Sequence, residues 1–116
     1  MLITKTPFRV SFCGGGSDLE AFYKTYGGCV LSTSINKYMY LSIHPYFNET
    51  QTLLKYSENE LVNDLSEIRH KIFHQVLCDL GVSGVEISST ADVPGGTGLG
   101  SSSTFTVGLL HTLYCY

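Results

Sequence analysis

The chain has 116 residues, of which 43% are hydrophobic and 15% charged, and its formal net charge is −3. This length allows one domain with one modest core, and the composition is that of an ordinary globular protein. No run of lysine or arginine is present, so we expect no nucleic-acid partner. No apolar stretch is long enough to span a bilayer and the first ten residues lack the apolar core of a signal peptide, so no membrane partner is expected either.

Cysteine usage gives an expectation about the compartment. The four cysteines show no CxxC spacing and lie mostly inside apolar segments. We therefore expect reduced thiols in the core of a cytoplasmic protein, rather than a disulfide or a zinc site. The residues concerned are Cys13, Cys29, Cys78 and Cys115.

The first predicted element is a strand over residues 3–13, ITKTPFRVSFC. Alternation places Phe8, Val10 and Phe12 on one face and Arg9 on the other. Three glycines interrupt the strand.

A short helix is predicted next. Ser17-Asp18-Leu19-Glu20 has the pattern of a capping box, in which the serine bonds forward and the glutamate reaches back. Gly27 is expected to end this helix in the left-handed conformation. The apolar residues at helical spacing are Leu19, Phe22, Tyr23 and Tyr26.

The middle of the chain predicts a sheet and a longer helix. Alternation over residues 29–45 indicates a long strand with one face on the core, and a turn leads to a shorter strand over 52–56. From 64 to 80 the period becomes helical, with Gly81 as the end of the helix. The expected buried stripe is Leu65, Ile68, Ile72, Val76 and Leu80.

A further strand over 85–89 precedes a glycine-rich stretch and a final apolar helix. The order β, α, β, β, α, β, α with antiparallel neighbours argues for an α+β fold and a single domain over residues 1–116. The last helix has no stop signal, so we expect the chain to continue in a longer protein.

The glycine-rich stretch, residues 92–104 (DVPGGTGLGSSST), predicts an anion site. Glycine lets backbone amides turn toward a ligand and lets that ligand approach closely. The following helix adds unpaired first-turn amides and the positive end of its dipole, which suits nucleotide phosphates. The alternative is a flexible turn with a serine helix cap.

Two familiar phosphate loops are excluded. A Walker loop needs lysine after its second glycine, whereas Ser101 follows Gly100 here. The dinucleotide fingerprint GxGxxG also fails, because one of its glycines falls on Ser101 in either register.

The stretch PGGTGLGSSS resembles the phosphate-binding motif of the GHMP kinases, Pro-x-x-x-Gly-Leu-Gly-Ser-Ser followed by a helix. About 80 residues earlier, Arg9, Gly14 and Asp18 are similar to the family's first motif, in which a basic residue precedes a glycine by five positions and an acid by nine. Within the family, GGGSD and TYGGCVLSTSINKYMYLSI most resemble kinases of D-glycero-D-manno-heptose 7-phosphate, with fucokinase-like enzymes next. Ser103 stands where the family often has alanine.

The resemblance implies a ribosomal-protein-type α+β domain with a left-handed βαβ crossover, incomplete at its C-terminal end. It implies ATP- and Mg²⁺-dependent phosphorylation of a sugar or sugar phosphate, the best candidate being the anomeric hydroxyl of D-glycero-D-manno-heptose 7-phosphate. The family's catalytic base and acidic Mg²⁺ ligand would lie beyond residue 116, so the chain alone is expected to be inactive.

The same resemblance assigns roles to residues. Arg9 would be the catalytic cation beside the transferred phosphoryl group, and Ser102 the Mg²⁺ ligand. Asp18 would bind sugar hydroxyls, helped by Gly14, Gly15 and Gly16. The residues implied to bind the ATP phosphates are Pro94, Gly95, Gly96, Gly98, Leu99, Gly100, Ser101, Ser102 and Ser103, with Ser101 and Ser103 also expected to cap the helix.

For several residues a purely structural role stays open beside the functional one. Arg9 has the alternative of a solvent-facing strand residue, and Asp18 that of a first-turn acid favoured by the helix dipole. His70 and His74 have the spacing of a two-histidine metal site, but no third ligand is evident and a solvated helix face is favoured. Tyr38 and Tyr40 are expected to pack on the sheet surface rather than to form the floor of a pocket.

Two other function classes remain alternatives. One is a non-catalytic module, or an inactive fragment, that binds nucleotide or phosphosugar. The other is a ribosomal-type RNA binder, which the acidic balance and the lack of a basic stripe oppose.

Overall fold

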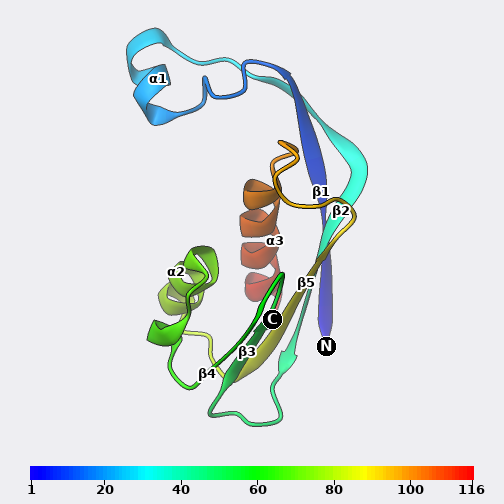
Figure 1. The fold of residues 1–116 in the computed structure, drawn as a ribbon, viewed down its shortest axis with the longest axis vertical. Coiled ribbons are helices and arrows are strands. Elements are labelled where there is room, and N and C mark those ends of the chain that lie inside the picture. Colours follow the sequence, from blue (N-terminus) through cyan, green and yellow to red (C-terminus); the bar gives the residue numbers. More distant parts are fainter.

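The computed structural model describes residues 1–116 and shows an α+β fold, as expected (Figure 1). The strands form one sheet in the order β1-β2-β5-β3-β4. β3 and β5 run parallel and the other neighbours antiparallel. The elements are β1 (Leu2–Cys13), α1 (Glu20–Tyr26), β2 (Leu31–Pro45), β3 (Thr52–Lys55), β4 (Asn59–Val62), a 3-10 turn η1 (Leu65–Glu67), α2 (Lys71–Leu80), β5 (Val85–Ala91) and α3 (Ser101–Cys115).

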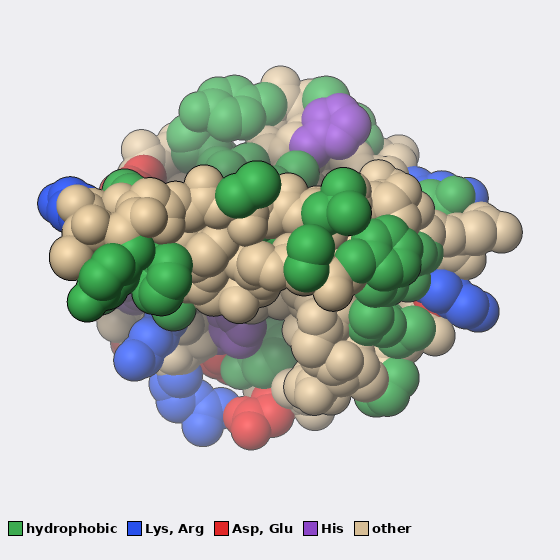
Figure 2. Space-filling view, turned by 90° about the horizontal axis from the view of Figure 1, so that it is seen from above, with side chains coloured by type: hydrophobic (Ala, Val, Ile, Leu, Met, Phe, Trp, Pro, Cys, Tyr) green, Lys and Arg blue, Asp and Glu red, His purple; other side chains and the backbone are tan.

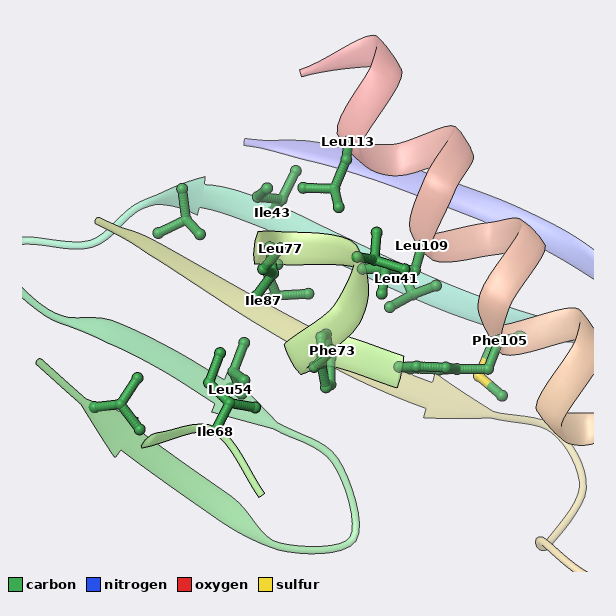
Figure 3. Packing of buried hydrophobic residues seen from close by; sticks show 14 of the residues in the cluster. Leu41, Ile43, Leu54, Ile68, Phe73, Leu77, Ile87, Phe105, Leu109 and Leu113 are labelled. Atoms are coloured by element: carbon green, nitrogen blue, oxygen red, sulfur yellow. The ribbon is translucent and has the colours of Figure 1, made fainter. Parts of the chain in front are cut away.

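The core lies between one face of the sheet and the helices α2 and α3 (Figure 3). Leu41 and Ile43 on β2 and Ile87 on β5 are fully buried, as the alternation along these strands predicts. The helices contribute Phe73, Leu77, Phe105, Leu109 and Leu113. This core fixes α3, and therefore the loop that precedes it, on the sheet.

Close packing of α3 on the sheet depends on Gly108. A Cβ at this position would lie 2.8 Å from Leu41 Cδ1 and 2.9 Å from Thr6 Oγ1, closer than van der Waals contact allows. One turn further along, the hydroxyls of Thr112 and Thr4 share a buried hydrogen bond of 2.6 Å. A small residue and a polar pair therefore set the distance between α3 and β1.

The segment between β1 and β2 departs from prediction. α1 begins at Glu20 without any side-chain cap, so the capping box is wrong. Ser17 instead joins the two ends of the segment between β1 and β2. Its Oγ lies 2.7 Å from the carbonyl oxygen of Gly14 and 2.9 Å from that of Cys29. The same Oγ accepts a hydrogen bond from the Cys29 N–H. A Cβ on Gly14 would overlap the Cys29 carbonyl oxygen, so this glycine is needed for closure. Gly27 ends α1 with a positive φ of 72°, but its ψ of 164° lies outside the left-handed helical region.

The apolar face of α1 is not buried in this chain. No residue of the helix is buried, and Leu19 and Tyr26 are 65% and 77% exposed. The helix stands away from the rest of the fold in Figure 1, and Figure 2 shows hydrophobic side chains on the surface at this end. On β1, Phe8 is buried, whereas Phe12 is exposed where the strand runs on beyond the start of α3 (Figure 1).

The predicted helix over 64–80 is in fact two elements. η1 and α2 are separated by Ile68–His70, and Phe73 and Leu77 are buried where the prediction had Ile72 and Leu80. The short strand β4 was not predicted; it precedes this break and supplies its anchor, described below. Gly81 does end α2 in the left-handed conformation, as predicted.

The cysteines are free, but all four are exposed, so the expectation of core thiols is wrong. Cys13 and Cys29 lie at the base of the α1 segment, and the other two lie on outward-facing positions of α2 and α3. No helix of the structure has the length and apolar character needed to cross a membrane.

Substitution of Gly108 tests the packing of α3. We expect Gly108→Leu to lower the free energy of unfolding by about 1–3 kcal/mol or more, because the added side chain overpacks a filled interface. Urea unfolding followed by circular dichroism measures the change. His111→Leu, at an exposed position of the same helix, is the control, and equal stability of the two variants would contradict the packing shown here.

Candidate functional site

The loop between β5 and α3, residues 92–100, has a conformation that requires glycine. Gly96, Gly98 and Gly100 have φ values of 79°, 74° and 73°, a region that residues with a side chain rarely adopt. An added Cβ on Gly95, Gly96 or Gly98 would meet no atom within 4 Å. The loop is therefore shaped by its glycines and is open on the side where those side chains would have been.

Both ends of this loop are tied to the sheet. At its start, the Asp92 carboxylate accepts from the Tyr38 N–H at 2.8 Å, and the Asp92 N–H donates to the Tyr38 carbonyl at 2.9 Å. At its end, the Arg9 N–H donates to the Leu99 carbonyl at 3.4 Å. Sequence reasoning missed the role of Asp92, although an acid directly after a strand was a visible signal.

The start of α3 presents unpaired donors. Gly100 is the N-cap, in the left-handed conformation and with no side-chain cap, so the expected capping by Ser101 and Ser103 is wrong. Thr104 is the first amide that bonds back, to the Gly100 carbonyl at 2.9 Å. The amides and hydroxyls of residues 101–103 therefore have no protein partner and lie at the positive end of the helix dipole.

Arg9 lies against the glycine loop. A Cβ on Gly100 would lie 3.3 Å from the Cγ, Nε and Cζ atoms of Arg9, and the guanidinium donates to Ser11 Oγ at 2.7 Å. Arg9 is half-buried, which rules out a purely solvent-facing residue. With Ser103 and Thr104 it lines a cavity of about 280 Å³ between β1 and α3. The structure thus brings together the arginine and the loop that lie about 90 residues apart in the sequence.

A second cavity, of about 290 Å³, lies by the first turn of α3 and is lined by different residues. Gly95, Ser101 and Ser102 form the part nearest the loop. The rest is uncharged and partly aromatic, with contributions from Met39, Tyr56, Ile72, His70 and Phe105. The same helix terminus therefore borders one cavity with a cation and one without any charged side chain.

A buried carboxylate holds part of the second cavity in place. Glu60 on β4 is only 4% exposed and accepts from the Tyr56 hydroxyl at 2.5 Å, the Arg69 N–H at 2.7 Å and the His70 N–H at 3.2 Å. Burial raises the pKa of Glu60, but these hydrogen bonds outweigh burial and leave its pKa below the ordinary value. The bond to Glu60 raises the pKa of Tyr56 to about 12. Sequence reasoning missed Glu60, although it alternates with Val62 on a buried face of the short run NELV.

The other predicted residues are placed apart from the loop. Asp18 is exposed and its Oδ1 accepts from the Gly16 N–H at 3.1 Å. No hydrogen bond or ion pair joins Asp18 to Arg9 or to the glycine loop, and the segment carrying it lies beyond the start of α3 in Figure 1. Gly15 and Gly16 leave the backbone accessible there, whereas Gly14 packs against Cys29.

The two histidines of α2 do not share a solvated face. His70 is the N-cap of α2 and packs on aromatic rings, so that prediction is wrong for His70. No group of three or more His, Cys, Asp or Glu side chains gathers in a metal-binding arrangement. Tyr38 and Tyr40 pack on the sheet surface as expected, their rings 6.2 Å apart and Lys5 Nζ 3.8 Å from the Tyr38 ring centroid.

The α+β fold and the glycine loop before α3 are the features that resemble the GHMP kinases, and comparison with known families agrees with this resemblance. The model of the GHMP kinases N terminal domain matches residues 54–116, more than half of the chain, and the chain belongs to this family. Among curated proteins, it is similar to the D-glycero-alpha-D-manno-heptose 7-phosphate kinase of Campylobacter jejuni, with 29% identity over 119 residues. That match covers 92% of this chain and 35% of the relative, so the chain spans about a third of the relative's length.

Solved structures support the fold. A D-glycero-D-manno-heptose 1-phosphate kinase from Bacteroides thetaiotaomicron matches with a TM-score of 0.79 and 26% identity, covering 97% of this chain and 41% of that one. The mevalonate kinase of Methanococcus jannaschii matches with a TM-score of 0.71 and 21% identity, covering 97% and 39%. The second likeness concerns the fold alone.

Acid unfolding of a Glu60→Gln variant tests the buried network. The folded pKa of Glu60 is lowered, so its contribution to stability is present above the unfolded pKa and is lost as pH falls through the folded value. We expect Glu60→Gln to be less stable at pH 7 by about 1–3 kcal/mol, with a smaller difference from the wild type at pH 3. Urea midpoints from pH 3 to 7 measure this, and a difference that does not change with pH would contradict an ionised Glu60.

Proposed function

We propose that the chain forms the nucleotide- and substrate-binding part of an ATP-dependent kinase that phosphorylates a hydroxyl of a sugar or sugar phosphate. The observation that carries this proposal is the contact of Arg9 with a glycine loop whose following amides are unpaired. Phosphoryl transfer depends mostly on positioning and charge neutralisation, and these groups supply both. Family membership and the two heptose phosphate kinases among the relatives support it.

The residues of the loop fit the phosphates of ATP. Three positive-φ glycines leave one side open, and the first-turn amides of α3 add donors without a competing protein partner. Each dipole contact contributes only about 0.3–1 kcal/mol, so several amides must converge on one ligand. The proposed phosphate-binding set is Pro94, Gly95, Gly96, Gly98, Leu99, Gly100, Ser101, Ser102 and Ser103.

Arg9 is proposed to act on the transferred group. Its guanidinium lies where the loop meets α3, and it lines the cavity that borders Ser103. A fixed cation there neutralises charge on the phosphoryl oxygens as transfer proceeds, and its hydrogen bond to Ser11 limits its freedom. ATP supplies the phosphoryl group.

Ser102 is proposed as a magnesium ligand. Its hydroxyl makes no hydrogen bond as a donor or acceptor within the chain, and it is exposed at the start of α3. Mg²⁺ prefers oxygen ligands and keeps several waters, so one hydroxyl together with phosphate oxygens fits its needs.

The substrate is proposed to be D-glycero-D-manno-heptose 7-phosphate, phosphorylated at its anomeric hydroxyl. The Campylobacter jejuni relative is named for this compound. Asp18, with the open backbone at Gly15 and Gly16 and with Gly14 nearby, would accept hydrogen bonds from sugar hydroxyls. We place the protein in the cytoplasm and treat residues 1–116 as one N-terminal GHMP domain.

A specific observation favours a second candidate, a non-catalytic module that binds nucleotide or phosphosugar. Neither cavity beside the glycine loop is lined by an aspartate or glutamate, so no carboxylate of the chain is placed there to act as a general base. A coupled assay of ADP release on the full-length protein separates the two. Release with heptose 7-phosphate, above that with fucose, galactose or mannose, supports the kinase, and ATP binding without release supports the module.

Substitution of Arg9 tests its part in the reaction. In the full-length protein we expect Arg9→Met to lower kcat by about 10²–10³-fold with a much smaller change in the Kd of Mg·ATP, because the cation acts chiefly on the transition state. Lys55→Met, which removes a cation from β3, is the control for net charge. Equal losses in kcat and in ATP affinity would show that Arg9 only helps the nucleotide to dock.

Substitution of Asp18 tests the sugar site. Asn retains an oxygen that accepts from the Gly16 N–H, so the local turn is kept while the charge is lost. In the full-length protein we expect Asp18→Asn to raise the KM of the sugar about 10–100-fold and to leave the melting temperature unchanged. Glu20→Gln, on the same segment, is the control. A lowered melting temperature with unchanged KM would assign Asp18 a structural role.

A further inference from the structure

His70 has one ring nitrogen committed to the protein and one that is open. Its Nδ1 accepts from the Phe73 N–H at 3.3 Å and so caps α2. A nitrogen that accepts an N–H carries no proton, so the neutral ring holds its hydrogen on Nε2. Nε2 bonds to no protein atom, and no buried side-chain nitrogen or oxygen in the structure lacks a partner. Nε2–H is therefore an accessible donor on a residue that lines the uncharged cavity.

The surroundings of His70 hold its ring in a fixed position. The ring centroid lies 4.8 Å from that of Tyr56, 5.1 Å from Phe73 and 5.2 Å from Phe105, and none of these rings is parallel to the imidazole. The backbone N–H of His70 and the Tyr56 hydroxyl both donate to Glu60, so one buried carboxylate holds the backbone at His70 and the Tyr56 side chain together. A helix cap alone does not require this arrangement, because asparagine or serine caps a helix as well.

The cavity is suited to the base of a nucleotide rather than to its phosphates. Its lining carries no lysine, arginine, aspartate or glutamate, and includes the aromatic rings of Tyr56, His70 and Phe105. Ligand pockets of this kind combine apolar and aromatic walls with a few placed polar groups. Gly95 and Ser102, at its other end, belong to the phosphate-binding set, so base and phosphates fit one continuous ligand.

We propose that His70 contacts the edge of the purine base of the nucleotide, with Nε2–H donating to one of its ring nitrogens. This inference rests on the proposed nucleotide function of the cavity and makes His70 a specificity-determining residue. Purines carry ring nitrogens that accept hydrogen bonds, so a fixed donor discriminates between a nucleotide and a bare polyphosphate. Glu60 acts through His70 and Tyr56 and is a positioning residue.

The test compares His70→Asn with His74→Asn, which lies one turn further along α2 and does not line the cavity. Asparagine is among the best N-cap residues, so His70→Asn keeps the cap and removes the ring. Calorimetry on the intact protein measures the Kd of Mg·ATP and of inorganic tripolyphosphate with Mg²⁺. We expect His70→Asn to weaken Mg·ATP at least tenfold, to change tripolyphosphate less than twofold, and to keep the circular dichroism spectrum of the folded wild type, while His74→Asn changes none of these.

The outcomes are distinguishable. Unchanged Mg·ATP binding by His70→Asn overturns the inference and leaves His70 as a cap. Equal weakening of Mg·ATP and tripolyphosphate overturns it as well, because the loss is then not specific to the base. A wild-type protein that binds tripolyphosphate as tightly as Mg·ATP has no base contact, whereas a wild type that binds neither ligand overturns the proposed function itself.

Discussion

The attachment of the glycine loop to two strands is the constraint on which the candidate site depends. Asp92 pairs with Tyr38 on β2 at the start of the loop, and Leu99 accepts from Arg9 on β1 at its end. Unpaired amides attract an anion only if they stay converged, and a loop rich in glycine loses more entropy on ordering than any other. The two attachments, together with the packing of α3 on the sheet at Gly108, order the loop in the absence of a ligand. The entropy of ordering the loop is therefore lost on folding and not on binding.

The same constraint gives the site two different sides. β1 brings the Arg9 guanidinium to one side of the start of α3. The turn between β3 and β4 and the start of α2 bring the uncharged aromatic side chains of Tyr56 and His70 to another. A nucleoside triphosphate has the matching division, with a flat uncharged base and a charged tail. Glu60 accepts from the Tyr56 hydroxyl and from the backbone N–H of His70, so it fixes the Tyr56 side chain and the backbone at His70. A buried carboxylate with three donors remains ionised, and the Arg69 Nε atom, 3.8 Å from Glu60 Oε2, adds a favourable charge.

Much of the fold, and the center of the site, could be predicted from the sequence. Period-two alternation predicted β1 and β2, and the glycine run followed by serines predicted a loop before a helix. Segments that depend on distant partners could not be predicted. Ser17 fits the pattern of a capping box, but its hydroxyl bonds to the carbonyl oxygens of Gly14 and Cys29. A local sequence pattern cannot show a partner as distant as Cys29. The break before α2 arises because Glu60 accepts hydrogen bonds from the amides of Arg69 and His70. A four-residue strand such as β4 gives too short a pattern to detect.

The exposure of the cysteines could not be predicted either. They were expected in the core because their sequence neighbours are apolar, but an apolar segment is not always covered: no residue of α1 is buried in this chain.

Chemical-shift mapping by NMR tests the central claim most directly, because it reports on each amide of the loop. A uniformly ¹⁵N-labelled sample of the protein is titrated with Mg·ATP while the backbone amide signals are followed. The account predicts that the largest changes fall on residues 95–103 and on Arg9, with smaller ones on the residues lining the aromatic cavity. Saturating Mg·ATP that leaves the amides of residues 95–103 unshifted, or that shifts only the α1 segment, would contradict it.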